Sequence, residues 1–134
     1  MLLDLSSFVK ALASLDRAAI RAQATPADEE LRDAVIQRFE YTYELAWKML
    51  KRHLEQVVPD PARIDGLSFR ELIREGAERG IVAEPEPWFE YRHQRNLTSH
   101  AYNSAAAQLV FQTALGFRSA ARALLAELER RNNE

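Results

Sequence analysis

The sequence predicts an all-α protein, an antiparallel up-and-down helical bundle with three long helices and two short ones. Two observations lead to this fold class. Apolar residues recur at steps of three and four along most of the chain, which is the period of amphipathic helices. No segment alternates as a strand does, and no repeat or low-complexity linker interrupts the 134 residues. The chain is long enough for one hydrophobic core, so residues 1–134 are expected to form a single domain.

The first two helices follow from apolar spacing and one break. Residues ~4–23 carry a stripe at helical spacing, formed by Leu5, Phe8, Leu12, Leu15 and Ala19. Thr25 and Pro26 break this pattern. A second helix is expected over residues ~26–57, with Pro26 in its first turn and the acidic residues 28–30 at its positive end.

The apolar side chains of the second helix spread unusually widely around its axis. At 100° per residue they cover an arc of roughly 200°, about twice what one side of a bundle requires. The members of this arc include Leu31, Val35, Ile36, Phe39, Tyr43, Leu45, Ala46, Trp47, Met49, Leu50 and Leu54. This width favours a helix that packs on two sides, and a second copy of the chain is the simplest additional partner. The sequence therefore predicts a homodimer.

Prolines and caps mark the remaining elements. Residues 57–61 end the second helix, and a loop leads to Ser68, which with Glu71 forms a capping box for a short helix from Phe69 to about Arg79. Gly80 closes that helix. Residues 84–87 open a fourth helix that should reach about residue 98. Asn103 or the residue after it caps a last helix over ~104–131, and residues 130–134 are expected to fray.

Composition narrows the classes of function. The chain has no Cys, which excludes disulfides, thiolate metal sites and thiol nucleophiles. A formal net charge of -2 argues against nucleic-acid binding by bulk charge, so any polyanion contact must be local. No apolar run approaches ~18 residues, and the first residues lack the features of a secretory signal. We expect a cytoplasmic protein without a membrane partner.

Residues 92–102 concentrate the polar side chains that suit catalysis. Arg95 can hold a phosphate with its planar fork, and His100 can move a proton near neutral pH. Arg92, His93 and Asn96 are auxiliary candidates for phosphate binding. Five residues of unbroken helix would place Arg95 and His100 about 140° apart. They converge only if the helix ends between them or if a twofold axis brings in the partner's copy.

This residue set fits RNA cleavage through a 2′-hydroxyl. Imidazole can act as both base and acid, and a guanidinium can stabilise the charge on phosphorus. Two copies of His100 across a dimer axis would supply both proton transfers. No metal or other cofactor is required, and Glu86 and Glu90 are too few and too dispersed to hold one.

Ordinary structural roles compete with each of these interpretations. Arg95 could be a helix-end cation paired with Glu90 or Glu86. His100 could cap or pack, and Tyr102 could be a core tyrosine with its hydroxyl at the rim. His53 lies within the apolar arc of the second helix, where it could meet the helix dipole or an interface. Spacing alone leaves the function undecided.

Two sequence blocks resemble a known family. Arg-Asn-Leu-Thr-Ser-His-Ala-Tyr at residues 95–102 resembles the R-x4-H-x-Y signature of the HEPN superfamily, in its HepT-like branch. The block Phe-Glu-Tyr-Thr-Tyr-Glu-Leu-Ala-Trp-Lys-Met-Leu-Lys at residues 39–51 is similar to a helix of proteins named nucleotidyltransferase substrate-binding proteins, which belong to the same branch. The resemblance extends over nearly the whole chain.

The resemblance implies a specific function. Members of this branch are helical-bundle homodimers whose motifs meet near the dimer axis. They act as metal-independent ribonuclease toxins, paired with a minimal nucleotidyltransferase antitoxin that transfers AMP to the motif tyrosine. Carried over, Arg95 and His100 are the catalytic pair, Asn96 is the polar residue after the motif arginine, and Tyr102 is the AMP acceptor.

Two other interpretations stay open. The chain could be a non-catalytic module that binds a substrate or nucleotide for a separately encoded nucleotidyltransferase. It could also be a structural dimer whose motif merely orders a helix junction. The first alternative shares the dimer and the partner with the ribonuclease hypothesis and differs in whether His100 transfers protons.

Overall fold

The computed structural model describes residues 2–97 and 103–134, which contain helices and no strands. The elements in these ranges are α1 (Ser6–Ala24), α2 (Glu29–Val57), α3 (Pro61–Asp65), α4 (Phe69–Glu78), α5 (Glu86–Leu97) and α6 (Ser104–Asn132). The all-α prediction is confirmed for these residues. The pattern differs from the expected one by α3, a short helix in the segment that we predicted to be a loop.

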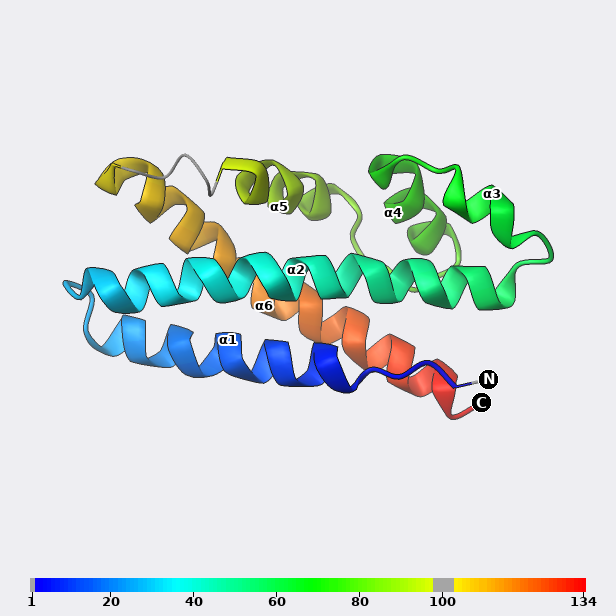
Figure 1. The fold of residues 1–134 in the computed structure, drawn as a ribbon, viewed down its shortest axis with the longest axis horizontal. Helices are drawn as coiled ribbons and strands as arrows, with labels where there is room; N and C mark the ends of the chain where they lie inside the picture. The colour runs from blue at the N-terminus through cyan, green and yellow to red at the C-terminus, as the bar shows by residue number, and fades with distance from the viewer. Residues whose placement is uncertain (1, 98–102) are drawn as a thin grey trace.

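Helix α2 is the central element of the fold. Figure 1 shows α1 along one side of α2, α3 to α5 along the other side, and α6 running diagonally across it. Helices α1, α2, α5 and α6 alternate in direction along the long axis, as an up-and-down bundle requires (Figure 1). α2 contacts each of the other five helices of the described chain.

These contacts explain the wide apolar arc of α2. Its fully buried members pack into the core, and Leu31, Leu45 and Trp47 are partly buried against that core. A helix surrounded on several sides needs an apolar surface wider than one stripe. Contacts within one chain therefore account for this arc, so its width does not by itself require a dimer, which stays a prediction. The dimer needs other support.

Aromatic rings fill the middle of the bundle. Phe117 of α6 packs edge-on against Phe39 of α2, with ring centres 5.2 Å apart. Tyr91 of α5 meets the same ring at 5.1 Å and Trp88 meets it at 5.7 Å. Edge-to-face pairs of this kind add specific geometry to apolar burial. The cluster fixes the position of α5, which carries the candidate site.

Side-chain caps set most of the helix boundaries. Asp28 caps α2 by accepting from the backbone N–H groups of Glu30 and Leu31. Pro26 therefore lies in the turn before α2, whereas we predicted it in the first turn of the helix. Asp60 caps α3 and Pro61 is its first residue, because proline lacks the N–H group that helix starts leave unpaired. The predicted capping box of Ser68 and Glu71 is present, and Asn103 caps α6.

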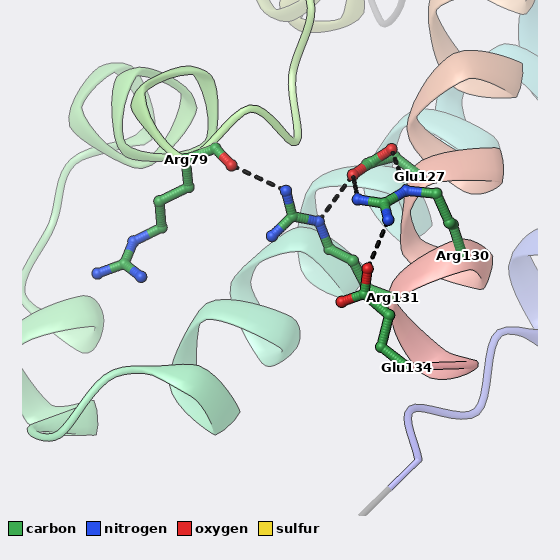
Figure 2. A network of polar contacts seen from close by, with 5 residues as sticks. All are labelled: Arg79, Glu127, Arg130, Arg131 and Glu134. Atoms are coloured by element: carbon green, nitrogen blue, oxygen red, sulfur yellow. Dashed lines mark hydrogen bonds and ion pairs between the residues drawn. The ribbon is translucent and has the colours of Figure 1, made fainter.

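The end of α6 is tied to the rest of the chain. Figure 2 shows Glu127 accepting from Arg130 and Arg131 while Arg131 also donates to the carbonyl of Arg79, at 2.8 Å. These contacts lower the pKa of Glu127 to about 2. Asn132 bonds both backbone groups of Leu3. The predicted frayed tail is thus wrong at Arg130 to Asn132, which side-chain hydrogen bonds hold in place.

Gly76 allows α4 to approach α2 closely. A Cβ atom added there would lie 2.9 Å from Cγ2 of Val82 and 3.2 Å from the Leu50 side chain. Gly80 follows α4 with φ of 75°, the left-handed conformation that glycine adopts without strain. It confirms the predicted end of this helix.

Candidate functional site

Helix α5 presents the described part of the candidate motif. Arg92, His93, Arg95 and Asn96 all lie on its C-terminal half, with Arg95 in the last turn as predicted. His100 and Tyr102 lie outside the described residues, so their placement is not part of this structure. The part of the site that the structure describes is therefore the part on α5, around Arg95.

Arg95 forms an ion pair with Glu44 of α2. Its Nε atom lies 3.0 Å from Oε1 of Glu44, and the two side chains are 37% and 29% exposed. This carboxylate comes from a different helix than Glu86 and Glu90, the partners weighed from the sequence. The pair orients the guanidinium at the end of α5, and five N–H donors allow an arginine to contact more than one group.

Glu90 has a different partner. Gln94, which is 3% exposed, donates from Nε2 to Oε1 of Glu90 at 2.8 Å. This contact holds the buried amide one residue before Arg95. Nothing in the sequence pattern singled out Gln94, because a polar residue on a helix is usually exposed.

Arg92 lies one helical turn from Arg95, on the same face of α5. Its guanidinium lies 4.7 Å from the centre of the Phe69 ring, a cation–π arrangement. Beneath it, burial raises the pKa of the Tyr43 hydroxyl to about 12, and the positive charge of Arg92 opposes this rise. The Tyr43 hydroxyl therefore stays neutral near neutral pH.

His93 and Asn96, the other auxiliary candidates, have exposed side chains. Residues 92, 95 and 96 fall on adjoining parts of the helix surface, whereas position 93 is offset by 100° from position 92. The structure thus groups Arg92 with Arg95 and leaves His93 apart from that pair.

A small cleft opens beside Arg92. It has a volume of about 240 Å³, and its lining comes from Trp47, Lys51, Ile64, Leu67, Phe69, Leu72 and Arg92. Trp47 and Phe69 meet edge to face in its wall, with ring centres 6.2 Å apart. The indole Nε1 of Trp47 is buried and has no hydrogen-bond partner among the described residues.

His53 lies in another part of the fold. His53 is buried in α2, 7% exposed, near Arg79, Arg131 and Glu127. Burial is the main cause that lowers its pKa, and the two arginines lower it further. His53 therefore belongs to the interior contact of α2 with the ends of α4 and α6, far along α2 from Glu44.

Two other kinds of site are absent from the described residues. In residues 2–97 and 103–134, no group of three or more His, Asp or Glu side chains is arranged to hold a metal ion. Within the same residues, no helix combines the length and the apolar character needed to cross a bilayer.

Comparison with known proteins places the chain in a family. Residues 3–130 match the family described as nucleotidyltransferase substrate binding protein like. This chain is a member of that family. A Haemophilus influenzae protein named probable ribonuclease HepT is 33% identical over 117 residues, which are 87% of this chain and 80% of that protein.

Two solved structures are similar to this chain in fold. A Haemophilus influenzae structure, described as the fold of a substrate binding domain of a nucleotidyltransferase, matches with a TM-score of 0.89 and 28% identity. The match covers 94% of this chain and 99% of that chain. A Thermus thermophilus crystal structure matches with a TM-score of 0.75 and 31% identity, over 90% of this chain and 98% of that one.

The two blocks by which the sequence resembles this family meet in space. The first lies on α2 and supplies Glu44, while the second begins on α5 with Arg95. The sequence predicted the first block on a helix and the second at a helix end, with Arg95 in the last turn, but it did not identify Glu44 as the partner of Arg95. The only hint of this partner in the sequence was that Glu44 is an acidic residue within the first block.

Proposed function

We propose that this chain is a metal-independent ribonuclease, the toxin of a pair with a minimal nucleotidyltransferase, and that AMP transfer to Tyr102 silences it. The observation that carries the proposal is the position of Arg95, which pairs with Glu44 at the end of α5, five residues before His100. The similarity to a protein named probable ribonuclease HepT supports the same activity.

The chemistry uses groups that the chain itself provides. Arg95 binds the scissile phosphate and stabilises the charge that develops on its oxygens. His100 takes the proton of the attacking 2′-hydroxyl, and a second imidazole protonates the leaving 5′-oxygen. In a homodimer the second imidazole is His100 of the other copy. Two exposed apolar side chains, Leu97 within the motif and Leu109 after it, support the interface that this arrangement needs.

The silencing step follows from charge and size. An AMP group on Tyr102 adds a bulky anion two residues from His100. It competes with the substrate phosphate for Arg95 and obstructs the approach of RNA. The family description supports a nucleotidyltransferase as the partner that supplies the AMP group.

The test of the ribonuclease is cleavage of RNA by the purified chain in the presence of a chelator. We expect cleavage by the wild type, and a loss of at least about a hundredfold in Arg95→Ala and His100→Ala. Arg17→Ala serves as the matched control, because it removes an exposed cation from α1. A wild-type chain without nuclease activity on total cellular RNA would contradict the proposal.

The test of the silencing step is a mass measurement after incubation with the nucleotidyltransferase and ATP. The expected result is an increase by one or more AMP units, with Tyr102 as the modified residue. A Tyr102→Phe variant that gains the same mass would show that the acceptor is a different side chain.

A second candidate function is supported by the cleft beside Arg92 and by the family description. In this case the chain binds a substrate or nucleotide for a separate nucleotidyltransferase and cleaves nothing. It predicts nucleotide binding that is the same in His100→Ala and in the wild type, together with the absence of nuclease activity.

A further inference from the structure

Arginines and aromatic rings alternate along one surface formed by α4 and α5. The Arg70 guanidinium lies 4.0 Å from the centre of the Phe89 ring, and the Arg74 guanidinium lies 5.6 Å from it. Next to this group, the guanidinium of Arg92 stacks over the ring of Phe69. We call these five residues the arginine–aromatic surface. In Figure 1, α4 and α5 lie on the side of α2 opposite to α1.

The positive charge of this surface is not neutralised by nearby acids. Arg70, Arg74 and Arg92 have exposed side chains, and none has a carboxylate partner among the described residues. On the other side of α4, by contrast, Glu75 pairs with Arg63 and Arg79. A chain with a net charge of -2 thus keeps a local cluster of three unpaired cations. Such a cluster attracts a polyanion despite the overall charge.

Two small clefts border the Arg92–Phe69 stack. One is the cleft beside Trp47, of about 240 Å³. The other has about 280 Å³ and is lined by Ser68, Phe69, Arg70, Phe89 and Arg92. Sites for drug-sized ligands begin at about 300 Å³, so each cleft suits a smaller unit, such as one nucleobase or one phosphate. Two adjoining clefts that share Phe69 and Arg92 suit consecutive units of a chain.

We propose that the arginine–aromatic surface binds single-stranded RNA next to the cleaved link, with bases stacked on its planar groups and phosphates held by its arginines. The inference rests on the proposed ribonuclease function and adds a binding track to it. Arg92 and Arg95 are three residues apart on α5, about 4.5 Å along the helix axis. A strand with its scissile phosphate on Arg95 can therefore continue onto Arg92 and from there to Arg70.

The chemistry of the surface favours RNA over an acidic protein. Charge alone would attract both, but planar guanidinium groups on aromatic rings also offer stacking faces that bases use and carboxylates do not. The donor at Nε1 of Trp47, which has no partner among the described residues, matches an acceptor on a base or phosphate after a small adjustment of the cleft.

The experiment measures binding of a fluorescent single-stranded RNA by anisotropy, with His100→Ala in every chain and a chelator present so that the RNA stays intact. Adding Arg70→Gln and Arg74→Gln together should weaken binding by at least about fivefold. It should also reduce the slope of log affinity against log salt by about 0.7 for each lost phosphate contact. Arg17→Gln is the matched control, an exposed arginine of α1.

A second variant tests stacking separately from charge. Phe69→Leu keeps an apolar side chain in the partly buried position but removes the ring face. We expect weaker binding, by about fivefold or more, with an unchanged salt slope. An unchanged thermal transition confirms that the variant is folded. The double arginine variant, whose changes are confined to exposed side chains, provides the test if Phe69→Leu does not fold.

The outcomes separate this inference from the proposed function. Equal affinity and equal salt slope in the double variant and in Arg17→Gln would overturn the inference. If the double variant instead loses only its association with a nucleotidyltransferase, the surface binds that protein and the inference is also overturned. A chain that binds RNA through this surface without cleaving it would keep the inference and remove the ribonuclease.

Discussion

The Nε atom of Arg95 lies 3.0 Å from Oε1 of Glu44, so the last turn of α5 is joined to the middle of α2. This pair connects the two sequence blocks that resemble the family. It also holds the guanidinium in one orientation before substrate binds. Orientation matters because a misplacement of about 1 Å in a catalytic group can cost about a hundredfold in rate.

Glu44→Ala should therefore slow RNA cleavage without unfolding the chain. We expect a decrease of roughly ten- to a hundredfold in the rate, because Arg95 loses its positioning partner. Stability should change by less than about 1 kcal/mol, because partly exposed ion pairs contribute little. Cleavage rates and urea unfolding measure the two effects. Faster cleavage in Glu44→Ala would show that Glu44 competes with the phosphate and does not position Arg95.

The proposed dimer can be tested at the side chains that flank the motif. Leu109→Glu places a charge at a position that is 55% exposed in the single chain, so folding should be unaffected. If a second copy covers this position, sedimentation will show a dimer for the wild type and a monomer for the variant. Ile20→Glu on α1, where the side chain is 64% exposed, should remain dimeric. A wild type that is monomeric at micromolar concentration contradicts the dimer directly.

Two glycines in helices should respond oppositely to alanine. Gly76→Ala should destabilise the chain by about 1–3 kcal/mol, because its Cβ would contact Val82 and Leu50 too closely. Gly116→Ala in α6, where no atom lies within 4 Å of the added Cβ, should stabilise it by about 0.5–1 kcal/mol. Urea unfolding measures both. A stabilised Gly76→Ala would mean that α4 and α2 are not packed as described.

His53 should make stability depend on pH. Its pKa in the folded chain lies below the ordinary value of 6.5, mainly because of burial. Below that pH the unfolded chain binds a proton that the folded chain does not yet bind, so the free energy of unfolding falls. The fall continues until the pH passes the lowered pKa. His53→Leu should reduce this loss of stability as the pH falls below about 7.

The sequence predicted the helix ends that short-range sequence patterns mark. The capping box of Ser68 and Glu71, the cap at Asn103 and the end at Gly80 were all readable, because each is a short-range pattern. The short α3 was missed because two prolines next to Asp60 read as a loop, although Pro61 is suited to a first helical position.

Long-range contacts could not be predicted in the same way. Arg95 finds Glu44 across 51 positions of sequence, and the stack of Arg92 on Phe69 depends on how α5 lies against α4. The wide apolar arc of α2 also reflects long-range contacts. We took its width to mean packing on two sides, the bundle and a second copy, whereas the tertiary structure shows that α1, α3, α4, α5 and α6 all contact α2.

The most direct measurement compares two short RNAs in the presence of a chelator. One has ribose throughout, and the other has a 2′-deoxy sugar at the single link that the purified chain cleaves. If Arg95 and His100 act as proposed, the first RNA is cut to leave a 2′,3′-cyclic phosphate, and the second stays intact at that link. Cleavage of both RNAs, or of neither, would contradict the account.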